Sequence, residues 1–312
     1  MKRSGIYIGI SPASRFARIV LRGITDYFSE KSLHFELDIP FNDSFKLQHP
    51  VKGIIAGARM PSDVHALLAL KVPVVNISSF LISSKLPSVI SDNEMGGRMA
   101  AEHLIKCRFH NFAYNGRRSG HSYTLRGKGF KETVEARGFS YSEYLHKQKA
   151  PVEKISPVQQ QDLRRWLDKL PKPVGIFCGI DRDAWEIWSG CDALGLKIGK
   201  DVGIVGFGND EFYCQTRRPY LSSVENRPDR IGYEAAALLL RLMRGARPPA
   251  APLLIPPGGV VQRESASIFL TEDTHVDMAI QFIRDHLNDP KLMENIFKHV
   301  PMSRRTLERR FQ

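Results

Sequence analysis

Short apolar runs alternate with helical patterns along most of this chain. Runs with the length of single buried strands lie at Ile6–Ile10, Leu33–Ile39, Gly53–Ala56, Val72–Ile77, Val89–Ser91, Asn111–Tyr114, Tyr141–His146, Val174–Cys178 and Val202–Gly206. Stretches with helical periodicity lie between them, at Arg15–Glu30, Ser62–Leu70, Glu94–Cys107, Thr124–Arg137, Gln159–Lys169, Arg182–Leu194 and Asp229–Arg244. Such alternation is typical of doubly wound parallel sheets that helices cover on both faces. This many strands exceeds one such sheet, so the pattern predicts an α/β fold with two lobes over residues 1–265.

The alternation ends near residue 265, and residues 266–312 have a purely helical pattern. Glu264–Leu270 has the composition of a linker. Helices are expected to begin at Thr274, Lys291 and Ser303, the first with Thr274 as its capping residue. The apolar stripe of the first helix is formed by Val276, Ile280, Ile283 and Leu287. We therefore predict an all-α domain after the two lobes.

The last helix is short and rich in arginine, and it follows another short helix across a tight turn. This arrangement is typical of a helix-turn-helix that binds DNA. Leu307 and Phe311 are four residues apart and are expected to face the core. Arg305, Glu308 and Arg309 have i, i+3 and i+4 spacing and are expected to share the opposite face. Arginine can pair with guanine and glutamate with cytosine. The residues expected to contact DNA are Ser303, Arg304, Arg305, Glu308 and Arg309. A solvated, charged terminal helix is the alternative interpretation.

The charge balance of the chain is basic but unevenly distributed. The sequence has 45 Lys and Arg residues against 33 Asp and Glu, a net charge of +12. Residues 271–312 hold seven basic and seven acidic residues, so the whole surplus lies in the preceding 270. A basic balance favours nucleic acid as a partner. Because the surplus is spread over 98–137, 147–172 and 217–247, a solvated basic surface is the alternative.

Other classes of protein are disfavoured by the sequence. Its longest apolar run, Ala235–Leu240, has six residues, against the roughly 20 that a membrane-spanning helix needs. Pro12 and Arg15 interrupt the apolar N-terminal run too early for a signal peptide, which indicates a cytoplasmic protein without a membrane partner. The four cysteines form no C-x-x-C pair, so neither a disulfide framework nor a zinc site is expected. Nucleotide-binding and hydrolase motifs are absent, and we expect neither an enzyme nor a bound cofactor.

The segment Met302–Phe311, with the two helices before it, resembles the first helix-turn-helix of the AraC-type transcription regulators. The resemblance implies that Arg305, Glu308 and Arg309 line a recognition helix. The domain of that family carries a second helix-turn-helix, whereas this sequence stops at Gln312. The expectation is therefore a fragment of a longer protein, and weak DNA binding by this chain alone.

The longer domain resembles the sensor domain of the LacI-type regulators, which has a periplasmic-binding-protein-like fold. The resemblance rests on Val89–Gly96 leading into Ala100–Leu104, on Arg126–Phe130, on Asp201–Asn209 and on Arg218–Val224. A sensor of this type before an AraC-type domain is the arrangement of the xylose operon activators. The fold so implied has two lobes joined by three chain crossings, with a small ligand enclosed between them. The crossings are expected near Asn115, Val224–Asn226 and Leu254–Gly259.

The resemblance also implies a set of ligand-binding residues. Hydroxyl-rich ligands such as sugars are bound by Asp, Asn and Arg side chains at the carboxyl ends of parallel strands. The expected ligand residues are Asp92, Arg126, Asp181, Asn209 and Asn226, with Ser11 and Ser14 after the first strand. Each of the three charged residues has a structural alternative. Asp92 and Asp181 can stabilise the first turns of their helices, the former within a capping box Ser91-x-x-Glu94, and Arg126 can form a surface ion pair.

Two positions depart from the pattern of the LacI-type sensors. Gly208 stands where these sensors usually have an aspartate that binds sugar hydroxyls, and Ile180 stands where they often have asparagine. A ligand that is smaller or less hydroxylated than xylose is therefore an open alternative.

The leading hypothesis is a dimeric, ligand-responsive transcription regulator that binds an operator or promoter, with a monosaccharide such as xylose as effector. The alternatives are a solute-binding protein that serves a transporter, an enzyme, and a cytoplasmic small-molecule-binding protein without DNA-binding activity.

Overall fold

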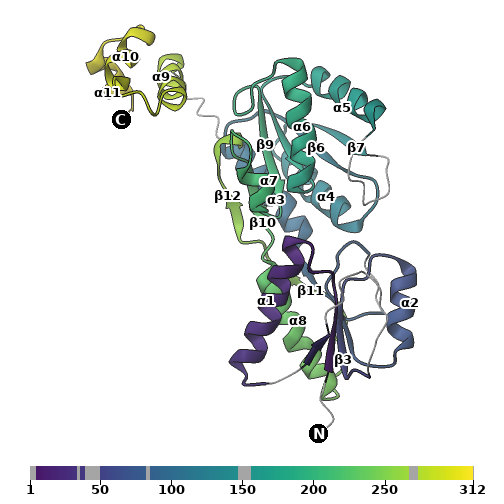
Figure 1. Ribbon diagram of the computed structural model, residues 1–312. Helices are drawn as coiled ribbons and strands as arrows, with labels where there is room; N and C mark the ends of the chain where they lie inside the picture. Colours follow the sequence, from purple (N-terminus) through teal and green to yellow (C-terminus); the bar gives the residue numbers. More distant parts are fainter. Residues whose placement is uncertain are drawn as a thin grey trace.

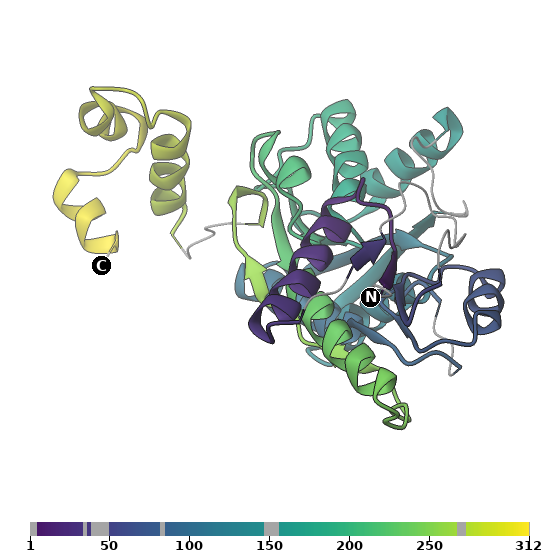
Figure 2. The same cartoon turned by 60° about the horizontal axis from the view of Figure 1, so that its bottom comes forward.

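The computed structural model describes residues 5–33, 36–38, 50–81, 85–146, 156–266 and 273–311. Two α/β lobes lie end to end, and three helices at the C-terminus form a separate segment beside the second lobe (Figure 1). Figure 2 shows this segment set apart from both lobes. The predicted two-lobed α/β fold with parallel sheets is confirmed. Within the described residues, no helix is long and apolar enough to cross a membrane.

The first lobe has a parallel sheet in the order β2-β1-β3-β4. Its strands are β1 (Gly5–Gly9), β2 (Glu36–Asp38), β3 (Gly53–Ala56) and β4 (Val74–Asn76). A parallel pair, β5 (Val89–Ser91) and β11 (Leu253–Ile255), adjoins it through the bridge between Asn76 and Ser88. Its helices are α1 (Arg15–Glu30), α2 (Pro61–Ala69) and α8 (Pro228–Met243). The core is almost wholly aliphatic: α1 contributes Val20 and Ile24, and α8 contributes Leu239.

The second lobe has a sheet in the order β12-β10-β9-β8-β6-β7, parallel except for β12. Its strands are β6 (Asn111–Arg117), β7 (Ser140–His146), β8 (Val174–Cys178), β9 (Val202–Phe207), β10 (Ser222–Glu225) and β12 (Gly259–Val261). Helices α3 (Asn93–Lys106) and α4 (His121–Glu135) cover one face, and α5 (Pro157–Lys169) and α6 (Asp181–Leu194) cover the other. A short helix α7 (Glu211–Gln215) follows β9. Glu264–Ala266 forms a short 3-10 helix packed against β9, where the sequence pattern predicts the start of a linker. The rest of that linker lies outside the described residues.

Three chain segments join the lobes, and one of them differs from the prediction. The crossings from β10 to α8 and from β11 to β12 lie where the sequence places them. The crossing expected near Asn115 is wrong, because β6 lies inside the second sheet between β7 and β8. The chain passes between the lobes at Asp92 instead, since β5 belongs to the first lobe and α3 packs on α4 in the second.

Helices α3 and α4 approach so closely that only glycine fits at their contact. A Cβ atom on Gly97 would lie 2.0 Å from the carbonyl oxygen of Arg126, and one on Gly129 would lie 2.1 Å from that of Glu94. Contacts this short exclude any side chain without a backbone shift. The two glycines therefore fix Arg126 beside the N-terminus of α3, where the chain enters the second lobe.

The C-terminal segment consists of α9 (Thr274–Asp285), α10 (Leu292–His299) and α11 (Arg304–Phe311) around a small apolar core. That core contains Val276, Ala279, Phe282, Ile296, Val300 and Leu307. Three expectations for this segment are wrong. Asp273, rather than Thr274, caps α9 by accepting a hydrogen bond from the His275 amide at 2.9 Å. Leu287 lies beyond the end of α9 and is 65 % exposed, and Phe311 is 47 % exposed and is not part of the core cluster.

Candidate functional site

The carboxyl ends of the strands in both lobes point toward the junction between the lobes. The carbonyl oxygen of Phe80, which follows β4, accepts a hydrogen bond from the His121 amide at the start of α4, at 2.9 Å. Gly120 has a φ of +100°, and a Cβ there would lie 2.6 Å from the Phe80 ring. Carboxyl ends of parallel strands are the usual place for ligands in α/β proteins. The junction is therefore the candidate ligand site.

Arg126 is a buried and firmly anchored charged side chain at this junction. It is 7 % exposed, its Nε donates to Asn93 Oδ1 at 2.8 Å, and its Nη1 donates to the carbonyl oxygen of Gly179 at 2.6 Å. The guanidinium lies over the ring of Phe207 at 3.6 Å from its centroid. No hydrogen bond from Nη2 to a described residue is present. The alternative of a surface ion pair is wrong, because Arg126 is buried and its partners are neutral.

Asp92 lies next to this arginine through its chain neighbour Asn93. Its Oδ1 accepts a hydrogen bond from the Met95 amide at 2.9 Å, so Asp92 itself is the N-cap of α3. The capping box with Ser91 as N-cap is therefore wrong, although the structural role it assigned to Asp92 is present. Capping uses one carboxylate oxygen, and Oδ2 makes no hydrogen bond to the described residues.

Asp181 is almost fully buried, on the same side of the second lobe. It is 2 % exposed, and its oxygens accept hydrogen bonds from Ser223 Oγ at 2.5 Å and from the Asp210 amide at 2.7 Å. The N-cap position of α6 is Ile180, so the carboxylate ties α6 to β10 and α7 rather than capping its own helix. Burial raises the pKa of Asp181 to about 6, and the hydrogen bond from Ser223 opposes that shift.

Glycine at positions 206 and 208 makes room for the Asp181 carboxylate. A Cβ on Gly206 would lie 2.2 Å from Asp181 Oδ1, and one on Gly208, at a φ of +126°, would lie 3.2 Å from Oδ2. A larger residue at either position would push the carboxylate away. The Asp181 carboxylate from α6 therefore occupies the space beside the two glycines after β9.

The four remaining predicted ligand residues are Asn209, Asn226, Ser14 and Ser11. Asn209 Oδ1 accepts a hydrogen bond from Arg263 Nη2 at 2.7 Å, which holds the loop after β9. Asn226, at the β10 to α8 crossing, is 9 % exposed, and its buried Oδ1 has no partner among the described residues. Ser14 caps α1 by accepting from the Ala17 amide at 3.1 Å, and Ser11 accepts weakly from the Ala13 amide at 3.4 Å. Arg126, Asp92 and Asp181 are thus brought together, while the two serines lie on the other lobe.

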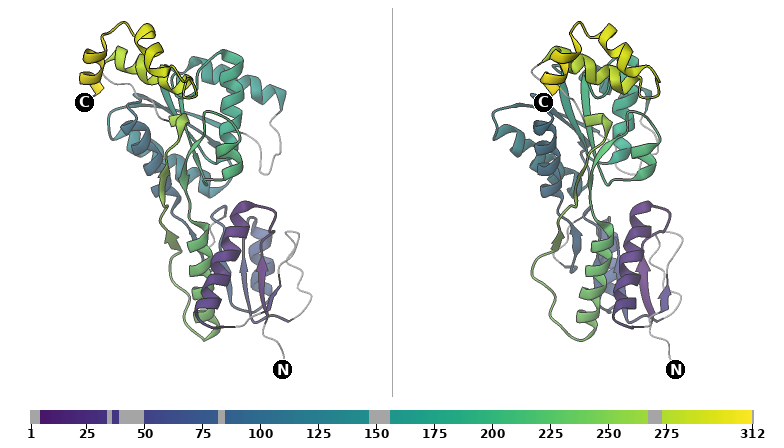
Figure 3. Two further views of the ribbon diagram at one scale, coloured as in Figure 1. Left: turned by 60° about the vertical axis from the view of Figure 1, so that its left-hand side comes forward. Right: turned by 90° about the vertical axis from the view of Figure 1, so that its left-hand side faces the viewer.

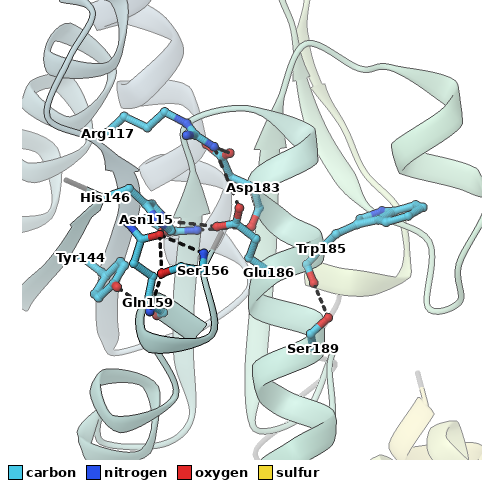
Figure 4. A network of polar contacts seen from close by, with 10 residues as sticks. All are labelled: Asn115, Arg117, Tyr144, His146, Ser156, Gln159, Asp183, Trp185, Glu186 and Ser189. Atoms are coloured by element: carbon cyan, nitrogen blue, oxygen red, sulfur yellow. Dashed lines mark hydrogen bonds and ion pairs between the residues drawn. The ribbon is translucent and has the colours of Figure 1, made fainter. Parts of the chain in front are cut away.

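A buried charged network that the sequence analysis missed lies at the carboxyl ends of β6 and β7 (Figure 4). Arg117 Nη2 contacts Asp183 Oδ1 at 2.6 Å, with side chains only 1 % and 0 % exposed. His146 Nε2 lies 2.9 Å from Asn115 Oδ1 and 3.1 Å from Glu186 Oε2. Arg117 Nε and Asp183 Oδ2 are buried without a hydrogen-bond partner in the described structure. Such a network leaves polar atoms that a bound ligand or water can satisfy.

Burial shifts the pKa values of the titratable members of this network. Burial raises the pKa of Glu186 to about 7, and the nearby Asp183 adds to the shift. Burial lowers the pKa of His146 to about 4, with Arg117 adding to the shift, so this histidine is neutral at pH 7. The available sequence signals were an arginine that ends an apolar strand and two acidic residues three apart at the start of a helix.

The predicted DNA-contacting residues lie on or just before α11, and most point to solvent. Arg305 and Arg309 are exposed and form no ion pair with described residues. Arg304 Nε pairs with Glu308 Oε1 at 2.8 Å across one turn of the helix. Ser303 Oγ accepts from the Thr306 amide at 3.3 Å and so stabilises the helix start. Arg305 and Arg309 are therefore the two side chains available to a partner.

Neither the junction nor the buried charged network contains a cluster of metal-ligating side chains among the described residues. The described residues contain no group of three or more His, Cys, Asp or Glu side chains that could hold a metal ion. The four cysteines are free thiols, three of them buried, and burial raises the pKa values of all four. The chemistry of the junction is therefore that of hydrogen-bonding arginine, aspartate and asparagine side chains.

The fold and the arrangement of polar residues at the junction define a two-lobed α/β protein of the periplasmic-binding-protein-like class. Residues 101–266, more than half of the chain, match the periplasmic binding protein-like domain. The chain belongs to this family.

Known proteins similar to the chain are transcription regulators. The xylose operon regulatory protein of Escherichia coli K12 is 28 % identical over 100 % of this chain and 82 % of its own length, and that of Haemophilus influenzae is 28 % identical over 95 % and 79 %. The catabolite control protein A of Priestia megaterium is 27 % identical over 74 % of this chain and 68 % of its own length. A solved xylose-binding transcription activator has a TM-score of 0.78 and 27 % identity, and covers 100 % of this chain and 82 % of its own. A LacI-family regulator from Enterococcus faecalis with bound ribose, at 20 % identity over 85 % of this chain and 98 % of its own, has a TM-score of 0.64 and shares the fold.

Proposed function

We propose that this chain is a cytoplasmic, ligand-responsive transcription regulator that binds a specific operator or promoter sequence. Its effector is a monosaccharide such as xylose, its output is activation, and its working form is a homodimer. The observation that carries this proposal is the presence, in one chain, of a two-lobed ligand-binding fold and a three-helix segment. The similarity to a xylose-binding activator, which extends over the whole chain, supports that combination.

The effector site lies at the junction of the lobes. Arg126 Nη2 and Asp92 Oδ2 are free of protein partners among the described residues, and Asn93, which accepts a hydrogen bond from Arg126 Nε, directly follows Asp92 in the chain. A donor and an acceptor in this arrangement suit neighbouring hydroxyl groups of a sugar. Asp181 and Asn209 hold the loop after β9, and Asn226, Ser11 and Ser14 complete the proposed set.

The DNA-binding part is an AraC-type helix-turn-helix formed by α10 and α11. Arg305 and Arg309 present the positive charge of this helix to solvent, which suits major-groove contacts to guanine. Glu308 and Arg304 pair with each other in the free chain, and Ser303 holds the helix start. In this proposal Glu308 exchanges its intrahelical partner for a base edge when DNA binds.

Effector binding acts by changing the relative population of two lobe arrangements. A ligand shifts such an equilibrium only if it binds one arrangement better than the other. The Phe80 carbonyl already bonds the first turn of α4, the helix that carries Arg126, so lobe position and arginine position are linked. A sugar held by Arg126 and by the first lobe therefore favours the closed arrangement.

Calorimetric titration with aldopentoses, aldohexoses and their phosphates tests the effector. We expect one sugar to bind, and Arg126→Lys to weaken that binding at least tenfold because lysine lacks the planar fork. Lys131→Ala, an exposed change on the same helix, is the matched control and should bind as the wild type does. Thermal unfolding of each variant separates lost binding from lost folding. Absence of binding across the whole panel would exclude a sugar effector.

A further inference from the structure

The surplus positive charge of this chain lies in the sensor and not in the segment proposed to bind DNA. Residues 271–312 are neutral overall, although most of the affinity of a protein for DNA comes from cations that neutralise phosphates. The proposed recognition helix offers two unpaired arginines, Arg305 and Arg309. A DNA-binding segment with so little net charge gains if another surface of the chain supplies phosphate contacts.

Five exposed cations gather at one edge of the second lobe. In the second sheet β6, β7, β8 and β9 are parallel, so the segments that lead into them meet at one edge of the lobe, at the N-terminal ends of these strands. Each of these four segments carries exposed basic residues. Among them are Lys106 before β6, Arg137 before β7, Lys169 before β8, and Lys197 and Lys200 before β9. We call these five residues the basic pole.

Three acidic residues near the basic pole bond to groups other than its five cations. Asp201 Oδ2 accepts a hydrogen bond from the Lys197 amide at 2.8 Å, and Asp192 pairs with Arg217. Glu264 accepts from the Tyr220 amide at 2.8 Å. Among the described residues, none of the five cations forms an ion pair. The five cations are therefore available to an anionic partner from outside the chain.

The basic pole lies at the end of the sensor from which the chain continues to the helical segment. The 3-10 helix Glu264–Ala266 packs at this edge, since Ser265 Oγ donates to the Ile204 carbonyl at 2.6 Å. A Cβ on Gly199 would lie 3.1 Å from the Glu264 carbonyl oxygen, so the loop with Lys197 and Lys200 is adjacent. Figure 3 shows the three helices next to the same end of the second lobe in both views. Six residues, 267–272, separate the two parts.

We propose that the basic pole is a second DNA-contacting surface, which binds backbone phosphates beside the site that α11 reads. The contact is independent of base sequence, because lysine side chains on a surface of this kind recognise charge and not base edges. It rests on the proposed function, in which the helical segment brings DNA to this end of the sensor. Lys197 and Lys200, nearest the 3-10 helix, contribute most, and Arg137, at the far edge of the sheet, contributes least.

The test is the salt dependence of binding to a mixed-sequence DNA duplex, measured by fluorescence anisotropy with the full chain. The test variant is Lys169→Gln/Lys197→Gln/Lys200→Gln. The matched control is Arg241→Gln/Arg244→Gln/Arg247→Gln, which removes three exposed cations from the end of α8 at the opposite end of the molecule (Figure 1). Both variants have the same net charge, and both sets of residues lie at or beyond helix C-termini. Thermal unfolding confirms that each is folded.

The expected result is a slope of log K against log salt that is smaller by about 2 to 3 in the test variant and unchanged in the control, because each lost phosphate contact removes about one unit. An equal decrease of the slope in both variants would mean that net charge alone causes the effect, and it would overturn the proposal. An unchanged slope in the test variant would overturn it as well.

An Arg305→Ala/Arg309→Ala variant separates this proposal from the proposed function. If it binds the duplex as the wild type does while the basic-pole variant loses affinity, the assignment of α11 fails and the basic pole stands. If both variants lose affinity, both assignments hold. If the wild-type chain binds no duplex at any salt concentration, both are wrong.

Discussion

The two lobes share one architecture but bury very different side chains. In the first lobe the buried polar residues among those described are small and neutral: Asn76, Ser88 and Ser91. In the second lobe they include ionisable groups: Arg117, Arg126, His146, Asp181 and Asp183. Both lobes pack helices on largely parallel sheets, and glycines allow close helix contacts in both, at Gly23 and Gly232 between α1 and α8 as at Gly97 and Gly129 between α3 and α4. The difference therefore does not come from the fold.

The difference indicates where the binding chemistry resides. A buried charge is tolerated only when a partner compensates its lost hydration, and such a pair is often no more stable than an apolar core of the same shape. The second lobe carries this cost at the carboxyl ends of its strands, where a ligand would bind. The first lobe contributes apolar and backbone groups, such as the Phe80 ring and carbonyl, to the junction. We infer that the second lobe holds the ligand and the first lobe closes on it.

Breaking the Arg117–Asp183 pair should give the largest effect on stability. Asp183→Ala leaves Arg117 buried without its partner, and we expect a loss of about 3–5 kcal/mol in urea unfolding. In the first lobe, Asn76→Ala removes the acceptor of the Ala58 and Ser78 amides and should cost about 1–3 kcal/mol.

A double variant, Arg117→Met/Asp183→Leu, controls for the loss of volume. It should recover most of the stability that Asp183→Ala loses, since no charge then stays unpaired. An Asp183→Ala variant that is no less stable than Asn76→Ala would remove the proposed contrast between the lobes.

The second prediction uses the pH dependence of Asp181. Its folded pKa, about 6, lies above the ordinary value of 3.8, so the folded state holds the proton more tightly. Asp181 therefore stabilises the fold below pH 4, and this contribution is lost as the pH rises through 6. Over that window the stability of Asp181→Asn relative to wild type should rise by about 3 kcal/mol, since each pKa unit corresponds to about 1.4 kcal/mol.

Urea unfolding of both proteins at a series of pH values between 4 and about 7 measures this difference. Glu186 and His146 titrate in the same pH window, with effects of opposite sign on stability. Both proteins contain these two residues, so the difference in stability between the proteins removes their contributions. A flat difference would mean that Asp181 is solvated in the folded protein.

Much of the fold could be predicted from the sequence, because its signals are local. Helices α1 and α6 show their periodicity within their own residues, and so do buried strands such as β8. The short strands β10, β11 and β12 were not predicted, since three or four residues carry little pattern. Their identity depends on distant partners: β11 pairs with β5, more than 160 residues earlier. The misplaced crossing at Asn115 has the same origin.

The residues of the candidate site also differ in whether a local sequence signal could identify them. Arg126 and Asp92 were found through family motifs that are contiguous in sequence. Their proximity depends on the α3–α4 glycine contact, which no local pattern records. Arg117 and Asp183 lie 66 residues apart in the sequence, and the sequence around each of them is typical of an ordinary surface charge. The side chains that set the second lobe apart from the first therefore became visible only in three dimensions.

The smallest effect is expected at the ion pair that joins the lobes directly. Arg15 Nη2 in α1 lies 3.6 Å from Glu211 Oε1 in α7, and the glutamate side chain is 70 % exposed. Exposed pairs of this kind contribute about 0.2–1 kcal/mol, because water and salt screen them. A double-mutant cycle with Arg15→Gln and Glu211→Gln, measured by thermal unfolding at low and high salt, should give a coupling within that range that disappears at high salt. A larger, salt-resistant coupling would mean that the lobes are held together before any ligand binds, and the first lobe would then be part of a fixed site and not a closing lid.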